Sequence, residues 1–258
     1  MLSPEAPAPR SVIAADGVRI ATYEFGEPDA PTVIAVHGFA SSALLNWNAS
    51  GWIRDLTRAG FHTIAIDQRG HGASDKPHDP TAYSMDILCA DVVSVLDTFM
   101  VSSTAFVGYS LGARVGWQVS RELPDRVSRA VLGGIPDGDP LTRFRLDEAR
   151  EFIEFGTAVD DSLTASYLEM AGGIRGNDLT ALVSLVEGMR GGPQPDAANS
   201  PPGPLLFATG SEDRILDASR TLALATPLGE FFEIPGRNHF NAPTSRAFRD
   251  EALAFLTR

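Results

Sequence analysis

Residues 104–119 read TAFVGYSLGARVGWQV. The run begins with an apolar segment typical of a buried strand, and residues 113–119 continue with a pattern typical of a helix. Ser110 lies at the corner between the two, with Gly108 and Gly112 on either side. Glycine at this spacing removes Cβ atoms that would collide with neighbouring backbone in a strained turn. The run therefore predicts a serine hydroxyl pushed out at a strand-to-helix corner, where a substrate carbonyl can meet it.

Short apolar runs of the same kind recur on both sides of this corner. They lie at 32–36, 63–66, 105–107, 130–132, 205–208 and 231–234. Helical spacing appears between the early runs, most clearly for Leu88, Val92, Val95, Leu96 and Phe99. Parallel strands need a crossover long enough to hold a helix, so this alternation predicts a mostly parallel sheet with helices on both faces.

The first part of the chain has a different pattern. Residues 11–25 contain two β-branched-rich segments around Asp16-Gly17, a dipeptide that favours the positive φ angles of a tight turn. We expect an antiparallel hairpin to open the fold. Residues 1–10 are rich in proline and lack the basic start and apolar stretch of a signal peptide, so we expect a mobile tail.

The alternation of strand and helix stops after the fourth of these runs. Helix-compatible stretches follow one another at about 136–202 without a convincing strand, which predicts a small helical cap inserted into the α/β domain. The whole chain, 1–258, is then one domain, with a core of 11–135 and 203–258. The cap ends in the Pro- and Gly-rich stretch 191–204, which is either a hinge or a long surface loop.

Composition excludes several classes of partner. The formal net charge is −12 and the sequence has no basic run, so a nucleic acid partner is not expected. No window reaches the length of a membrane span, and no membrane partner is expected. Cys89 is the single cysteine, which rules out an intrachain disulfide or a Cys-rich metal site and fits the reducing cytoplasm, the expected location. Oligomeric state cannot be read from the sequence.

The corner at Ser110 resembles the nucleophile turn of the α/β-hydrolase family. The resemblance implies an α/β-hydrolase fold with Ser110 as nucleophile, and a serine needs a base to take its proton. His239, in the segment 236–240, follows the last predicted strand, where the family's catalytic histidine is placed. The other four histidines are assigned elsewhere: His37 and His71 to structural loops, His62 to a strand start and His78 to a Pro-rich loop.

The resemblance also implies a carboxylate that orients the histidine. Asp213, just past a predicted strand end in the segment 208–215, matches the usual acid turn of the family. Glu212 is adjacent but projects differently from the same turn. Asp137 follows an earlier strand and is the rival, which the family's chain order Ser, acid, His disfavours.

Backbone donors for the oxyanion complete the implied site. His37-Gly38-Phe39 resembles the family's oxyanion loop, which assigns the N–H groups of Phe39 and Leu111 as donors. The run His-Gly-Gly-Gly of one lipase and esterase pattern is absent, so we expect the simpler loop type. The segment 67–75, DQRGHGASD, resembles another hallmark of the family and is assigned to architecture near that loop.

These assignments predict a carboxylesterase-like serine hydrolase that cleaves carboxylic esters of small to medium size through an acyl-enzyme, with no cofactor and no metal. The expected partner is a small-molecule ester or lactone. A lactonase resembling the enol-lactonases, or a carbon–carbon bond hydrolase, uses the same triad. A ligand-binding receptor on the same fold is the alternative from another class. Haloalkane dehalogenases and epoxide hydrolases, which use an aspartate nucleophile, are disfavoured because position 110 is serine.

Overall fold

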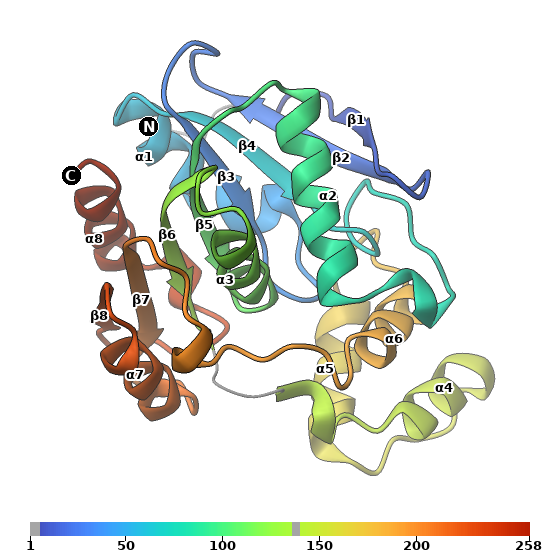
Figure 1. Cartoon of the computed structure of the whole chain (residues 1–258). Coiled ribbons are helices and arrows are strands. Elements are labelled where there is room, and N and C mark those ends of the chain that lie inside the picture. The colour runs from blue at the N-terminus through green and yellow to red at the C-terminus, as the bar shows by residue number, and fades with distance from the viewer. Residues whose placement is uncertain (1–5, 136–139) are drawn as a thin grey trace.

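The computed structural model describes residues 6–135 and 140–258. Its eight strands form one sheet in the order β1-β2-β4-β3-β5-β6-β7-β8 (Figure 1). The strands are β1 (Arg10–Ile13), β2 (Arg19–Phe25), β3 (Thr32–Val36), β4 (His62–Asp67), β5 (Thr104–Tyr109), β6 (Val127–Gly133), β7 (Leu205–Gly210) and β8 (Gly229–Ile234). Strands β3 to β8 run parallel to one another, which confirms the predicted mostly parallel sheet.

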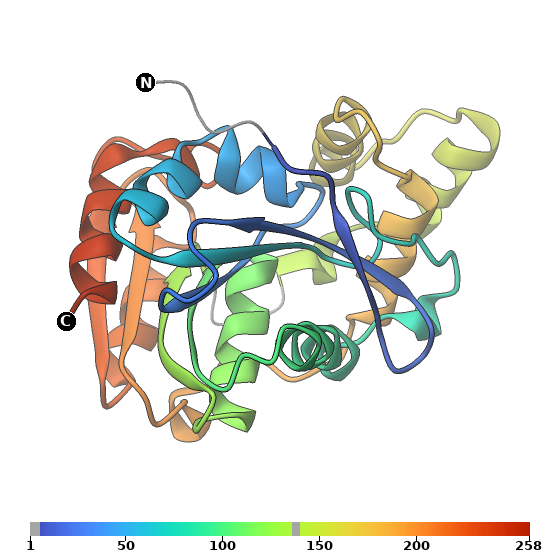
Figure 2. The same cartoon turned by 90° about the horizontal axis from the view of Figure 1, so that it is seen from above.

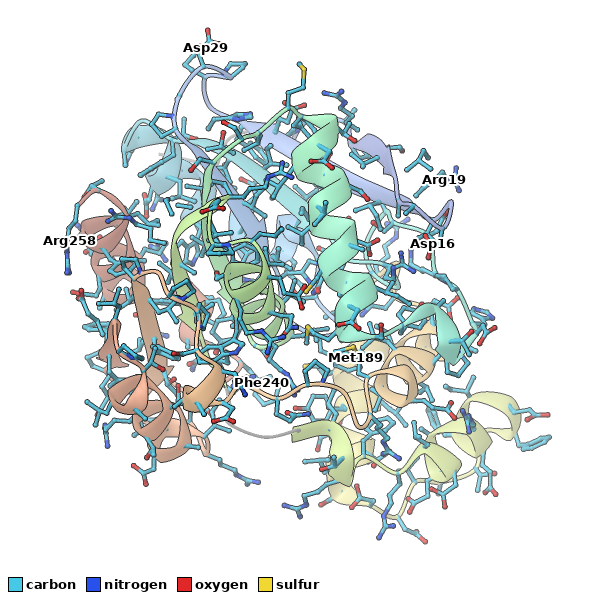
Figure 3. The ribbon with its side chains drawn as sticks, viewed as in Figure 1. Asp16, Arg19, Asp29, Met189, Phe240 and Arg258 are labelled. Carbon is cyan, nitrogen blue, oxygen red and sulfur yellow. The ribbon has the colours of Figure 1, made fainter. Side chains whose placement is uncertain are left out.

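An antiparallel hairpin opens the fold, as predicted. Strand β1 pairs with β2, and β2 pairs in turn with β4, also antiparallel. The turn between β1 and β2 uses positive φ only at Gly17, at 86°, while Asp16 keeps a negative φ. Figure 3 shows Asp16 and Arg19 at this turn, at the edge of the molecule.

Helices cover both faces of the sheet because successive side chains of each buried strand point to opposite faces. Ile34 and Val36 of β3 pack on one side with α2 (Met85–Thr98), α3 (Leu111–Glu122) and α7 (Leu216–Ala225). Val33 and Ala35 pack on the other side with α1 (Trp52–Arg58) and α8 (Arg246–Leu256). Figure 2 shows the strands lying between these two helical layers.

The described part of the segment between β6 and β7 is helical. It contains α4 (Leu146–Phe155), α5 (Ser162–Gly172) and α6 (Leu179–Gly188), with short 3-10 turns at Pro140–Arg143 and Ala197–Asn199. These helices lie together beside the sheet rather than on its two faces (Figure 1). We call residues 140–202 the helical segment. The division into a core of 11–135 and 203–258 and a cap of 136–202, and the hinge at 191–204, stay predictions.

Two regions carry sequence expectations that lie outside the described residues. Residues 1–5 belong to the predicted tail, and residues 136–139 include Asp137, the rival acid. Among the helices of the remaining chain, none combines the length and the apolar character that crossing a membrane requires.

Candidate active site

Ser110 adopts a backbone conformation that few residues with a side chain tolerate. Its φ is 52° and its ψ is −112°, between the end of β5 and the first turn of α3. Its N–H donates to the carbonyl oxygen of Gly133 at 2.8 Å, which ties the turn to the neighbouring strand. A Cβ on Gly108 would lie 2.3 Å from the carbonyl oxygen of Gly112, and one on Gly112 would lie 2.0 Å from that of Val36. Both glycines are therefore required by close backbone approach.

His239 reaches this turn from the loop that follows β8. Its Nε2 atom lies 3.0 Å from Oγ of Ser110, within hydrogen-bond distance. The loop is held in place by Tyr109, whose hydroxyl donates to the carbonyl oxygen of His239 at 2.5 Å. Burial raises the pKa of Tyr109 well above its usual value, so this hydroxyl stays a donor at neutral pH.

Asp213 lies on the far side of the imidazole from Ser110. Its Oδ2 atom is 2.7 Å from Nδ1 of His239, and Oδ1 accepts the N–H of Ile215 at 3.2 Å. The side chain of Asp213 is 3% exposed, compared with 25% for His239. A carboxylate acceptor at Nδ1 requires a proton on that nitrogen, which leaves Nε2 free to accept the serine proton. Glu212, its neighbour in the same turn, is exposed to solvent.

The proposed oxyanion donors lie beside Ser110 at the carboxyl ends of two paired strands. Strand β3 pairs with β5 so that Val36 faces Gly108, which brings the loop after β3 close to the turn. A Cβ on Gly38 would lie 3.3 Å from Cβ of Ser110. Within residues 6–135 and 140–258, the N–H groups of Phe39 and Leu111 have no hydrogen-bond acceptor. Both are thus free to bind an oxygen that develops negative charge.

Two buried histidines support the loop at 37–40, which carries the proposed oxyanion donor Phe39 and is called the oxyanion loop below. The Nε2 atom of His37 accepts the N–H of Gln68 at 3.1 Å, and Nε2 of His71 accepts the N–H of Ala40 at 3.0 Å. Burial lowers the pKa of His37 to about 4 and the pKa of His71 to about 3. Both rings are therefore neutral at neutral pH, which the accepting role of each Nε2 atom requires.

The segment 67–75 forms a hydrogen-bonded turn next to the oxyanion loop. Oδ1 of Asp67 accepts the N–H of Ala43 at 2.7 Å, and its Oδ2 accepts the N–H of Ala73 at 2.8 Å. Arg69 is 1% exposed and forms a bidentate pair with Asp91, with both contacts at 2.7 Å. Asp67 thus holds backbone and Arg69 joins the segment to α2 through Asp91, and these contacts do not reach Ser110, so they suit the architectural assignment.

Two aromatic side chains that the sequence did not single out, Tyr167 and Phe240, lie against residues of the proposed site. Tyr167 of α5 packs edge-to-face on Phe39 at 5.9 Å between ring centroids and lies 6.5 Å from Phe144. Burial, followed by the charge of Asp213, raises the pKa of Tyr167. Phe240 is 66% exposed and its ring lies 5.9 Å from that of His239. The contact between Tyr167 and Phe39 joins distant parts of the chain, so only the three-dimensional fold reveals it.

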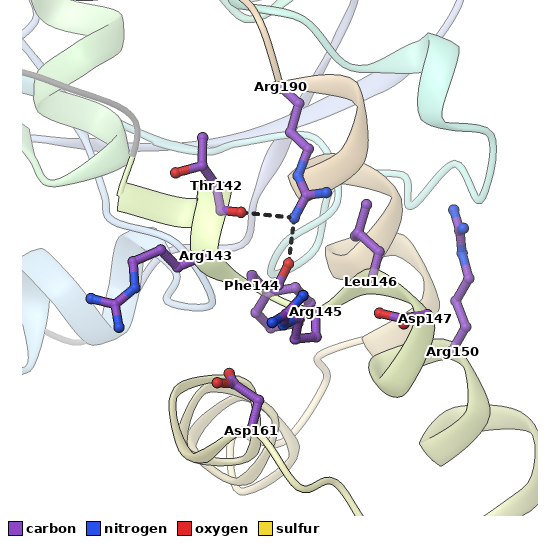
Figure 4. A pocket seen from close by; sticks show the side chains of 9 residues that line it. All are labelled: Thr142, Arg143, Phe144, Arg145, Leu146, Asp147, Arg150, Asp161 and Arg190. Carbon is purple, nitrogen blue, oxygen red and sulfur yellow. Dashed lines mark hydrogen bonds between the residues drawn. The ribbon is translucent and has the colours of Figure 1, made fainter.

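A separate pocket of about 620 Å³ lies within the helical segment (Figure 4). Four of its lining residues are arginines, namely Arg143, Arg145, Arg150 and Arg190. Arg190 donates to the carbonyl oxygen of Phe144, and Arg150 is paired with Glu187. Ser110, Asp213 and His239 do not line this pocket, so it is distinct from the triad.

Comparison with known proteins agrees with this geometry at the level of the fold. Residues 31–159 match the family described as alpha/beta hydrolase fold. Epoxide hydrolase A of Mycobacterium tuberculosis is 38% identical over 125 residues, which are 48% of this chain and 38% of that relative. The match thus spans well under half of that relative's length. Other epoxide hydrolases match this chain over stretches of similar length.

Solved structures match nearly the whole chain at lower identity. The enol-lactonase from Burkholderia xenovorans LB400 is 23% identical with a TM-score of 0.80, over 96% of this chain and all of that one. A structure from a study of carboxylesterases of Nitrososphaera gargenis is 15% identical with a TM-score of 0.77, over 96% of this chain and 98% of that one. The eight-stranded sheet, the strained serine turn and the matched family together show that this chain belongs to the alpha/beta hydrolase fold family.

Proposed function

We propose that this chain is a serine hydrolase that cleaves carboxylic esters of small to medium size through an acyl-enzyme intermediate. The observation that carries the proposal is the chain of contacts from Ser110 Oγ to His239 Nε2 at 3.0 Å and from His239 Nδ1 to Asp213 Oδ2 at 2.7 Å. A serine hydroxyl is a weak nucleophile, and a hydrogen-bonded neutral imidazole is the base that activates it.

Acylation begins when Oγ of Ser110 attacks the ester carbonyl carbon and its proton moves to Nε2 of His239. The carbonyl π electrons move onto oxygen, and the N–H groups of Phe39 and Leu111 stabilise the resulting oxyanion. Buried Asp213 stabilises the imidazolium through Nδ1. When the tetrahedral intermediate collapses, the bond to the alcohol breaks and Nε2 returns the proton to the leaving alkoxide.

Deacylation repeats these steps with water. Nε2 takes a proton from the attacking water, the acyl ester to Ser110 breaks, and the proton returns to Oγ as the acid leaves. A lactone is a cyclic ester and reacts through the same bonds. A carbon–carbon bond hydrolase uses the same triad but must in addition stabilise a carbanion leaving group.

Epoxide hydrolysis is the second candidate, since epoxide hydrolases are prominent among the relatives. The residue at position 110 argues against it. An aspartate that opens an epoxide forms an ester, which water can cleave at the carbonyl carbon. A serine that opened an epoxide would form an ether, which has no carbonyl for water to attack. Ser110 would then remain alkylated after one turnover.

The proposal is tested by hydrolysis of p-nitrophenyl acetate and p-nitrophenyl butyrate. Ser110→Ala should lower kcat by about a thousandfold or more, because removing the nucleophile leaves only the oxyanion donors and binding. Ser102→Ala is the matched control, since Ser102 is exposed and precedes β5 at the opposite end from Ser110. Equal rates for Ser110→Ala and the wild type would overturn the proposal.

A non-catalytic receptor on this fold is separated from an enzyme by a fluorophosphonate probe. An activated Ser110 should react with the probe and Ser110→Ala should not. Failure of the wild type to react would favour the receptor.

A further inference from the structure

The residue after the proposed oxyanion donor is held in an unusual conformation. Ala40 has a φ of 58°, in the left-handed region where a residue with a Cβ atom is strained, and it is completely buried. Residues in such conformations persist only where the surrounding structure holds them in place. The groups that hold Ala40 are therefore the groups that keep the N–H of Phe39 beside Ser110.

The hydrogen bonds of Ala40 come from two different parts of the molecule. Its N–H donates to Nε2 of His71, which belongs to the segment 67–75. Its carbonyl oxygen accepts from Nδ2 of Asn177 at 2.9 Å, and Asn177 belongs to the helical segment. The same Nδ2 atom donates to the carbonyl oxygen of Ala171 at 3.0 Å. Because both partners are carbonyl acceptors, the amide of Asn177 can make these bonds only with its nitrogen facing them.

Apolar contacts reinforce the same connection. Ala40 forms a small buried cluster with Ala171 of α5 and Leu182 of α6. The ring of Phe39 packs against the same cluster and against Tyr167. The oxyanion loop therefore lies between the segment 67–75 on one side and the helical segment on the other.

We propose that Asn177 is a positioning residue that makes the oxyanion donor of Phe39 depend on the docked helical segment. This inference rests on the proposed function. Without the amide of Asn177, the carbonyl oxygen of Ala40 loses its hydrogen-bond donor. The strained conformation of Ala40 is then held by one hydrogen bond instead of two. The loop can then relax toward negative φ, which turns the N–H of Phe39 away from the oxyanion. An enzyme with this connection cleaves esters efficiently only while the helical segment is docked.

The test compares Asn177→Ala and Asn177→Asp with a matched control, Ser184→Ala. The control also removes one hydrogen bond from the helical segment, since Oγ of Ser184 donates to the carbonyl oxygen of His78 at 2.6 Å and does not touch the oxyanion loop. Asn177→Asp keeps the side-chain volume but places a carboxylate against two carbonyl oxygens. Measurements are kcat and KM for p-nitrophenyl acetate, inhibition by a trifluoromethyl ketone, and melting temperature.

Both Asn177 variants should lower kcat by about tenfold to a hundredfold, less than the loss of a whole oxyanion donor, with KM changed less than about threefold. Inhibition by the trifluoromethyl ketone should weaken in parallel, because its adduct with Ser110 carries the oxyanion. Ser184→Ala should keep the wild-type kcat. Wild-type kcat in folded Asn177→Ala, an equal loss in Ser184→Ala, or loss of folding in both Asn177 variants would overturn the inference. Ser110→Ala is measured in the same assay. If it is inactive, the outcomes above concern the role of Asn177 alone. If it is as active as the wild type, the proposed function fails and this inference fails with it.

Discussion

The Nε2 atom of His71 accepts the N–H of Ala40 at 3.0 Å, inside a region where His71 is completely buried. His37 lies 5.0 Å away between ring centroids and accepts the N–H of Gln68 in the same way. Two uncharged imidazoles thus connect the oxyanion loop to the segment 67–75, and each accepts a backbone N–H through a nitrogen that protonation would block.

Stability should therefore fall as the pH is lowered from about 6.5. Burial lowers the pKa of His37 to about 4 and of His71 to about 3, whereas a histidine in the unfolded chain has a pKa of about 6.5. Between these values the unfolded state binds more protons than the folded state. The contribution of each neutral ring to the free energy of unfolding is fully present above about pH 6.5. It is lost as the pH falls toward the pKa of the folded state, at up to about 1.4 kcal/mol per pH unit.

Urea unfolding between pH 7 and pH 5 measures the slope of the free energy of unfolding against pH. This range lies above that in which most carboxylates titrate. His71→Gln should reduce the mean slope over this range by about 1 kcal/mol per pH unit, since one titrating ring is removed. His78→Gln is the matched control because its side chain is 57% exposed. A wild-type stability that does not change over this range would contradict the assignment.

Gly112→Ala should destabilise the protein by about 3 kcal/mol or more and abolish ester hydrolysis, because the new Cβ would lie 2.0 Å from the carbonyl oxygen of Val36. The matched substitution is Gly172→Ala in α5, where the nearest atom is 3.9 Å away. Alanine favours a helix over glycine by about 1 kcal/mol, so this variant should be as stable as the wild type or more stable. Similar melting temperatures for the two variants would argue against the tight turn at Ser110.

Asp213→Asn should lower kcat by about a thousandfold to ten-thousandfold with little change in KM, because an amide cannot stabilise the imidazolium as a carboxylate does. Glu212→Gln, in the same turn and exposed, should retain wild-type activity. Asp137→Asn tests the rival acid directly. Full activity in Asp213→Asn together with an inactive Asp137→Asn would reverse the assignment.

Asp91→Asn should destabilise the protein by about 3 kcal/mol, because the buried guanidinium of Arg69 loses its buried carboxylate partner and keeps only that of Asp16, whose side chain is 45% exposed. Asp97→Asn breaks an ion pair with Arg126 in which Asp97 is 62% exposed, and it should cost about 0.5 kcal/mol or less. Thermal or urea unfolding compares the two. Equal effects would show that the pair of Arg69 and Asp91 does not stabilise the fold as its burial suggests.

The sheet could be predicted because each buried strand leaves an apolar run in the sequence. The run 32–36 coincides with β3, whereas the run 105–107 covers only the middle of β5 (Thr104–Tyr109). The strand continues past the predicted run because Gly108 and Tyr109 do not extend the apolar pattern but still pair with β6. Local pattern identifies the strands, and pairing with neighbours decides where they end.

The residues of the proposed triad could be selected because each follows a predicted strand at the place that the resemblance to the α/β-hydrolase family implies. Asn177 could not be selected, since it lies 137 residues from Ala40 in the sequence and no local pattern records their contact. Asp91 likewise appears in the sequence as a polar position on a helix, and its burial against Arg69 follows only from packing. Sequence pattern thus identifies groups at strand ends but not the long-range contacts that position them.

The most direct test of serine ester hydrolysis is to trap the covalent intermediate. The wild type is mixed with p-nitrophenyl acetate, quenched in acid within milliseconds and digested, and the peptide that contains Ser110 is analysed by mass spectrometry. Styrene oxide is tested in parallel. We predict an acetyl group on Ser110, its absence in Ser110→Ala, and no turnover of the epoxide. Ester hydrolysis without acetyl-Ser110, or epoxide turnover that persists in Ser110→Ala, would contradict the proposal.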